Sequence, residues 1–323
     1  MAGPRRDTRG IVDAPDLFTR VQFRRRTPAA ALRPYIEHYW LIDWDLTEPY
    51  AAHVVPHPSV NLVFQQYADR PAFGEVAGVG LELFAQKLAG RGRVCGVQFR
   101  PGGFRPFAPE RPVTDWTDRR LPWTAVLTGG GAEPTGTGDA LPGGAGTDAA
   151  PVAPEPAHER EPARAPGPAQ VPAPAQVPAP ALVPGPAEVL GPADEDARVA
   201  ALDALLVPLL CDDPQLLARA ELAMGLADRI RRDRTIRRVA DFARDQGLSV
   251  RALQRLFAGY VGVSPKWVLL RYRVHEALER AASDAAVDWA ALAAELGYSD
   301  QAHLVRDVTA TIGVPPTAYA KAP

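Results

Sequence analysis

The last quarter of the chain contains an internal repeat, which constrains the fold more than any other feature of the sequence. Residues 239–249 return fifty positions later as residues 289–299, and after one inserted residue the match continues at an offset of fifty-one. Self-similarity at a fixed period indicates that one supersecondary unit is present twice. The identical pairs are Ala240 and Ala290, Ala243 and Ala293, Gly247 and Gly297, Ser249 and Ser299, Leu253 and Leu304, Arg255 and Arg306, Gly262 and Gly313, Val263 and Val314, and Pro265 and Pro316.

Each copy has the pattern of a helix-turn-helix motif. In the first copy, Gly247 suits the left-handed turn between two helices, and Ser249 can cap the second helix. We expect the motifs at about 235–260 and 288–312, joined by a helix at about 265–282. In each copy we expect a Ser to cap the second helix. Apolar residues three or four positions apart predict the buried stripe of the first copy's second helix: Val250, Leu253, Leu256, Phe257 and Tyr260.

The opposite face of that helix carries Arg251, Gln254 and Arg255. Arg and Gln offer paired hydrogen-bonding groups that match the major-groove edges of guanine and adenine. A charged helix face is often only solvated, but the duplication of the whole unit favours a recognition helix that binds double-stranded DNA.

The second copy presents a less polar face. Alignment through Leu304 places Gln301, Ala302, Val305 and Arg306 where the first copy has its polar residues. Each good bidentate base contact contributes about 1–3 kcal/mol of discrimination. We therefore predict that the first copy supplies more base discrimination and the second copy more positioning on the phosphates.

The repeat also resembles a known protein family. The segments Gly247-Leu248-Ser249-x-Arg251-x-Leu253-Gln254-Arg255-Leu256-Phe257 and Gly297-Tyr298-Ser299-Asp300-Gln301-Ala302-His303-Leu304-x-Arg306 are similar to the AraC/XylS family of bacterial transcription regulators. The resemblance implies a seven-helix DNA-binding domain with two recognition helices in successive major grooves. It further implies a sequence-specific transcription regulator rather than an enzyme, and it is compatible with an RNA polymerase contact and with a homodimer.

Charge is distributed in a way that agrees with this interpretation. Residues 229–323 carry 15 basic and 10 acidic side chains, whereas residues 129–228 carry 4 and 15, so the net charge of −2 hides a basic C-terminal region. Because the basic excess is modest, we expect a moderate dependence of DNA binding on salt.

The segment before this region changes character. Fifteen of the 34 prolines fall within residues 129–193, where a pattern of Pro, Ala, Gln and Val nearly repeats every six residues. Such a segment predicts a disordered Pro/Ala-rich linker, more often a spacer than a binding motif. Residues 194–323 are assigned to the all-α C-terminal domain, which begins with helices expected at 195–210 and 213–232.

Residues 1–128 are expected to form the sensing domain. Short strands are predicted at 41–42, 53–55, 61–64 and 93–99, separated by Pro and Gly. The segments 34–40, 54–64 and 96–104 resemble the N-terminal domain of one group of AraC-type regulators, which implies a compact β-rich domain, with a cupin-like fold as one option. The fold class is thus α+β multidomain, and a small-molecule effector would act across the linker.

Aromatic residues of this domain have two interpretations. Tyr39, Trp40, Trp44 and Phe64 could line a pocket for an apolar effector, although packing in the core is expected for most of them. Arg100-Pro101-Gly102-Gly103 could likewise approach an anion, but a turn after a strand is the simpler interpretation.

A rival hypothesis makes the N-terminal domain a metal-binding or small-molecule-binding enzyme that the C-terminal domain localises to DNA. His53 and His57, with Glu37 and His38, are its candidate ligands, but a strand followed by a Pro-containing turn does not place the two imidazoles on one helical face. No catalytic triad, phosphate loop or dinucleotide motif occurs. Cys95 is expected to be a buried strand residue. We therefore expect no catalytic residue, metal or cofactor.

The chain has neither an apolar run of eighteen residues nor an apolar stretch after its first residues that would suit a signal peptide. These features predict a cytoplasmic protein that does not bind membranes.

Overall fold

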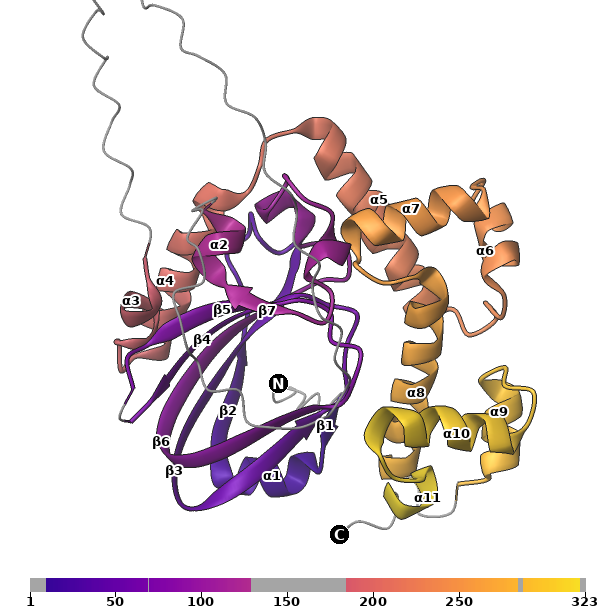
Figure 1. Cartoon of the computed structure of the whole chain (residues 1–323), viewed down its shortest axis with the longest axis horizontal. Helices are drawn as coiled ribbons and strands as arrows, with labels where there is room; N and C mark the ends of the chain where they lie inside the picture. The colour runs from indigo at the N-terminus through magenta and orange to yellow at the C-terminus, as the bar shows by residue number, and fades with distance from the viewer. Residues whose placement is uncertain (1–9, 69, 129–183, 284–286, 320–323) are drawn as a thin grey trace, which may run out of the picture. The chain divides into compact units, whose positions relative to one another are not determined.

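We describe the fold from a computed structural model, which defines residues 10–68, 70–128, 184–283 and 287–319. Most of the expected linker, residues 129–183, lies outside these residues. The N-terminal part is built on β-strands and the C-terminal part on helices (Figure 1), which confirms the predicted fold class.

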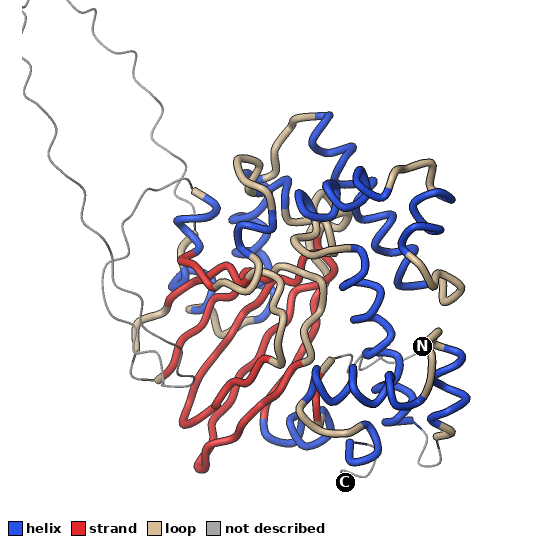
Figure 2. Tube along the Cα trace, turned by 45° about the vertical axis from the view of Figure 1, so that its right-hand side comes forward, coloured by secondary structure: helices blue, strands red, loops and turns tan. Residues whose placement is uncertain are grey.

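The strands of the N-terminal part form one antiparallel seven-stranded sheet (Figure 2). Its order is β1-β3-β6-β4-β5-β7, and β2 pairs with β3. The long strands β3 and β6 form its centre, and the short helix α1 precedes β2. The strands and α1 are β1 (Ile11–Val12), α1 (Ala14–Arg20), β2 (Val21–Arg26), β3 (Ile36–Val54), β4 (Asn61–Tyr67), β5 (Phe73–Ala77), β6 (Phe84–Phe99) and β7 (Arg120–Pro122).

Alternation along β3 separates its aromatic residues between the two faces of the sheet. Trp40 and Trp44 lie opposite Gly96 and Gly92 of β6. A Cβ atom at Gly92 would lie 2.1 Å from the Trp44 ring, so the glycine makes room for the indole. Tyr39 belongs to the other face and is fully buried.

Three short helices follow β6: the 3₁₀ helices η1 (Arg105–Phe107) and η2 (Val113–Trp116), and α2 (Trp123–Leu127). They are not anticipated by any periodic pattern in the sequence, because each is shorter than two turns.

The end of the expected linker is helical, which corrects the prediction that disorder extends to residue 193. Helix α3 (Pro186–Leu190) contributes Val189 and Leu190 to the core, both fully buried. These two apolar residues give the segment something to bury, which the Pro/Ala pattern before it lacks.

Helix α4 (Glu195–Leu206) packs against the β-sheet, which corrects the prediction that it belongs with the C-terminal helices. The Asp203 carboxylate accepts a hydrogen bond from the Tyr39 hydroxyl at 2.7 Å. Arg198, whose side chain is 2% exposed, pairs with Asp43 of β3 at 3.1 Å.

The C-terminal helices agree closely with the expected motifs. Asp213 caps the first of them through Gln215 N and Leu216 N, as its position before Pro214 predicts. The helices are α5 (Pro214–Arg232), α6 (Val239–Asp245), α7 (Val250–Tyr260), α8 (Pro265–Ser283), α9 (Trp289–Glu295), α10 (Gln301–Ile312) and α11 (Pro316–Tyr319), and the short 3₁₀ helix η3 (Val207–Leu209) precedes α5.

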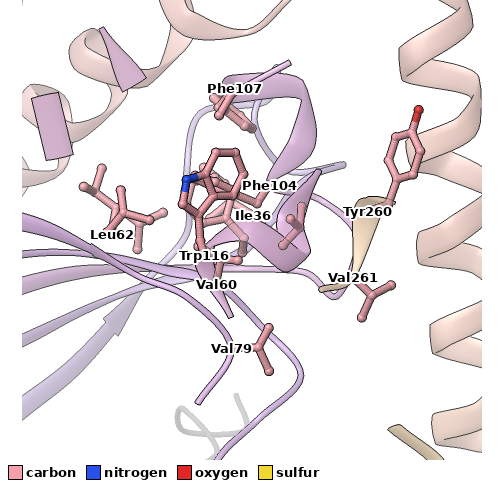
Figure 3. Packing of buried hydrophobic residues seen from close by; sticks show 14 of the residues in the cluster. Ile36, Val60, Leu62, Val79, Phe104, Phe107, Trp116, Tyr260 and Val261 are labelled. Carbon is pink, nitrogen blue, oxygen red and sulfur yellow. The ribbon is translucent and has the colours of Figure 1, made fainter. Parts of the chain in front are cut away.

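The β-sheet region and the first helix-turn-helix share one hydrophobic core. Phe104 and Trp116, from the segment after β6, stack edge to face at 5.3 Å and belong to the same cluster as Leu253 and Phe257 of α7. Figure 3 shows Phe104 and Trp116 together, with Tyr260 in the same cluster. The two regions therefore form one compact unit rather than two bodies joined only by the linker.

Polar contacts hold the end of α7 against the β-sheet region. Arg105 donates to the carbonyl oxygen of Gly259 at 2.9 Å, and the Thr117 hydroxyl donates to that of Gly262 at 2.7 Å. Gly262 has φ +92°, and a Cβ there would lie 2.9 Å from Val113 Cγ1.

The turn after β6 packs against helix α5. Gly102 lies against the backbone at Ala223 and Met224, and Arg100 pairs with Asp228 at 2.5 Å. The structure thus assigns this turn a packing role, in agreement with the simpler of the two interpretations.

Asp43→Asn should destabilise the protein more than Asp45→Asn. Asp43 is the charge partner of the buried Arg198. We expect the substitution to lower the free energy of unfolding by about 2 kcal/mol or more. This loss is smaller than for a wholly buried pair, because Asp43 retains contact with solvent. Asp45 pairs with Arg91 where both side chains are largely exposed, so Asp45→Asn should change the free energy of unfolding by less than about 0.5 kcal/mol. Urea unfolding of both variants measures the difference, and equal losses would contradict the docking of α4 through Asp43.

Gly262→Ala and Gly313→Ala form a matched pair, because each glycine follows the second helix of its motif at positive φ. The backbone strain should cost about 1 kcal/mol at either position. Only Gly262 faces the β-sheet region, whereas a Cβ at Gly313 would meet open space. We expect an additional loss of about 1–2 kcal/mol at Gly262 in thermal unfolding; similar values for the two variants would argue against this contact.

Candidate nucleic-acid interface

The first helix-turn-helix has the local geometry that its sequence predicts. Gly247 adopts φ +68° between α6 and α7, and the Ser249 side chain accepts a hydrogen bond from Ala252 N at 3.1 Å. Leu253 and Phe257 are fully buried, which directs the opposite side of α7 outward.

The three residues of the first motif that are predicted to contact DNA bases lie on this outward side. Arg251, Gln254 and Arg255 are all exposed, and their spacing places them on adjacent turns of α7. Val250, assigned to the apolar stripe, is 37% exposed at the start of the helix and is thus only at its margin.

The second motif differs in its cap. Gly297 adopts φ +76°, as expected, but the residue that caps α10 is Asp300 and not Ser299. The Asp300 side chain accepts from His303 N at 2.7 Å, and this hydrogen bond lowers the pKa of the carboxyl group. The one residue inserted within the second copy moves the cap by one position, so the prediction that a Ser caps both helices is wrong for the second copy.

The predicted face of the second motif is also directed outward. Gln301, Ala302 and Arg306 are exposed and Val305 is half-buried, while the other side of α10 is held in the core by Leu304, Val308 and Ile312. The structure thus presents two helix faces of unequal polarity, and Arg306 is the one charged group among the four predicted residues of α10.

Other cationic side chains near the two motifs were not selected from the sequence. Arg238, just before α6, and Lys266, at the start of α8, are exposed. Arg234 and Arg237 lie between α5 and α6 and contact the second motif. Sequence periodicity singles out helix faces, so it gives no signal for cations in the connecting segments.

The β-sheet region contains a cavity of about 690 Å³ bordered by α1, β2, β3, β4 and β6. Trp44 and Tyr67 meet edge to face at 5.7 Å in its lining. Of the four aromatic residues proposed for a pocket, Trp44 lines this cavity. Tyr39 and Phe64 are fully buried in the core. Trp40 is partly buried and packs against the hydrophobic cluster that contains Trp44. Charged residues also border it, including Arg20, Arg91 and Arg93.

The candidate metal ligands of the rival hypothesis are not gathered into one site. His53 lies in β3 opposite Ala85, while the His57 ring faces Tyr272 and His275 of α8 at centroid distances of 5.6 and 5.8 Å. Within the described ranges, no group of three or more His, Cys, Asp and Glu side chains could hold a metal ion.

Cys95 is buried in β6, and burial raises the pKa of its thiol to about 11. The thiol is therefore protonated at neutral pH, which agrees with the packing role expected for it. No helix among the residues that the structure defines is long and apolar enough to cross a membrane.

Comparison with known proteins identifies two domains. Residues 242–322 match the model of a helix-turn-helix domain, and residues 24–122 match a domain of unknown function, DUF6597. A search of curated proteins gives no match.

Similarity to solved structures is low. A 1.65 Å structure of ToxT from Vibrio cholerae aligns with 93% of this chain and 98% of its own at 8% identity and a TM-score of 0.38. A second structure, of ToxT from Vibrio cholerae O395, aligns with 94% and 97% at 8% identity and a TM-score of 0.37. These values do not assign a fold or a function.

The duplicated motif, its observed geometry and the matching domain model lead to one conclusion: the C-terminal part of this chain is a helix-turn-helix domain, and it is preceded by a DUF6597 domain.

Proposed function

We propose that the protein is a sequence-specific transcription regulator that binds double-stranded DNA through α7 and α10. One observation carries the proposal: both copies of the motif present their predicted contact residues outward while the opposite helix faces are buried. Two recognition helices on a single connecting helix suit two successive major grooves.

The two helices contribute unequally in this proposal. Arg251, Gln254 and Arg255 supply most of the base discrimination, since Arg and Gln match guanine and adenine edges in pairs. Arg306 contacts a phosphate or one base, and Ala302 and Val305 offer at most apolar contact with a thymine methyl group.

The β-sheet region acts as the regulatory part, and its cavity receives a small-molecule effector. Trp44 and Tyr67 provide an aromatic surface, and the arginines at the border provide hydrogen-bond donors. A change at this region can reach α5 and α7 directly, because Arg100 pairs with Asp228 of α5 and Arg105 donates to Gly259 of α7. Regulation therefore does not depend on the linker alone, which differs from the route expected from the sequence.

Alanine substitutions in α7 test the DNA-binding proposal. DNA enriched from a random pool by the full chain serves as the operator, and binding is followed by fluorescence anisotropy at several salt concentrations. Arg251→Ala and Arg255→Ala should each lower affinity by about fivefold to a hundredfold and relax base preference at one position. Arg306→Ala should weaken binding with little change in base preference.

Arg70→Ala, an exposed arginine of the β-sheet region, is the matched control and should bind as the unmodified protein does. The recognition-helix assignment is wrong if the two α7 variants keep affinity, base preference and salt dependence unchanged.

A cavity-filling substitution tests the effector site. Ala68 lines the cavity and is exposed, so Ala68→Trp fills the space without disturbing the core. Ala85→Trp, at an exposed β6 position outside the lining, is the control.

Compounds that raise the melting temperature of the unmodified protein by several degrees should lose this effect in Ala68→Trp and keep it in Ala85→Trp. Compounds that stabilise both variants equally would place the effector elsewhere.

A further inference from the structure

The two helix-turn-helix motifs are joined by more than the connecting helix. Six charged residues lie where the first motif, α8 and the second motif meet, and we call them the inter-motif cluster. They are Arg234, Arg237, Arg273, Glu276, Arg280 and Glu295.

The carboxylates of the inter-motif cluster are each shared by two arginines. Glu276 of α8 pairs with Arg234 at 2.8 Å and with Arg280 at 3.2 Å. Glu295, at the end of α9, pairs with Arg280 at 3.0 Å and with Arg234 at 3.5 Å. Arg234 precedes α6, so these pairs link the first motif to the second across α8.

Two further arginines bind backbone carbonyl groups on both sides. Arg273 of α8 donates to Gly297 in the turn of the second motif and to Ile236 just before α6, both at 3.4 Å. Arg237 donates to the carbonyl of Ala294 at 3.3 Å. Arg273 is half-buried, and burial lowers the pKa of its guanidinium.

The turn of the second motif fits closely into this arrangement. A Cβ at Gly297 would lie 3.3 Å from both Arg237 Cγ and Arg273 Nη2. Because α10 begins directly after this turn, the contacts that hold Gly297 also set the position of α10 relative to the first motif.

We infer that the inter-motif cluster fixes the distance and angle between α7 and α10, and thereby makes the protein selective for the spacing between its two half-sites on DNA. Inserting one base pair moves the second half-site by about 3.4 Å and rotates it by about 35° around the duplex. A pair of helices held rigidly cannot follow this movement without losing contacts. The inference rests on the proposed DNA-binding function and extends it to spacing.

The glutamates separate this role from phosphate binding. Glu276 and Glu295 cannot contact a phosphate favourably, so Glu276→Gln/Glu295→Gln loosens the cluster without removing a DNA contact. An arginine that binds phosphate, by contrast, would on removal weaken binding to all spacings equally and reduce the salt slope.

The test compares operator DNA, enriched from a random pool by the full chain, with the same DNA carrying one base pair inserted between the half-sites. For the unmodified protein we expect the insertion to weaken binding by about tenfold, the size of one lost base contact. In Glu276→Gln/Glu295→Gln this penalty should fall to about threefold or less. Glu221→Gln, an exposed change of equal charge on α5, should keep the full penalty.

Glu295→Gln alone guards against loss of fold, since its side chain is 45% exposed, and it should reduce the penalty in part. An insertion penalty that is the same in the unmodified protein and both glutamate variants overturns the inference, as does an unmodified protein that tolerates the insertion. Failure of the unmodified protein to enrich any DNA would instead reject the proposed function.

Discussion

The packing of the segment after β6 against α5 and α7 is the interaction on which the rest of the structure depends. Phe104 and Trp116 of the β-sheet region share one core with Leu253 and Phe257 of the first helix-turn-helix. The apolar side of α7 is thus buried partly by another region of the chain, and its polar side is left outward. The surface proposed to bind DNA and the region proposed to regulate it are consequently coupled through packed side chains. A close-packed protein interior transmits small displacements from one region to the other.

This coupling gives the two motifs different surroundings. The first motif is held at the end of α7 by Arg105 and Thr117, and the preceding helix α5 is held by Arg100. The second packs around α8 in a separate cluster of buried residues, to which the N-terminal region adds Val55. A change in the β-sheet region should therefore act most strongly on α7, which also carries the larger set of proposed base-reading residues.

Local signals in the sequence account for most of the helices and for the candidate DNA-binding faces. Gly247 and Gly297 adopt the left-handed turn that their positions predict, and Asp213 and Ser249 cap helices as expected. These features depend on residues close to one another in the chain, so they can be predicted from a single sequence. The cap of α10 was misplaced because Asp300 and Ser299 are adjacent and both suitable, and only the backbone decides between them.

Contacts between distant segments could not be predicted in the same way. The ion pair of Arg198 with Asp43 joins residues far apart in the chain and leaves no periodic pattern. The same holds for Arg237 with Ala294 and for Thr117 with Gly262. Chain order suggested that α4 belongs with the helices after it, whereas its buried residues complete the core over the β-sheet.

The shared core is tested most directly by following unfolding in urea with two probes on the unmodified protein. Four of the six tryptophans, Trp40, Trp44, Trp116 and Trp123, lie in the β-sheet region, while ellipticity at 222 nm is dominated by the helices. One core for both regions predicts that tryptophan fluorescence and ellipticity change together, with the same midpoint. Loss of the fluorescence signal at a clearly different urea concentration from the ellipticity would show two regions that unfold independently, and would contradict the account.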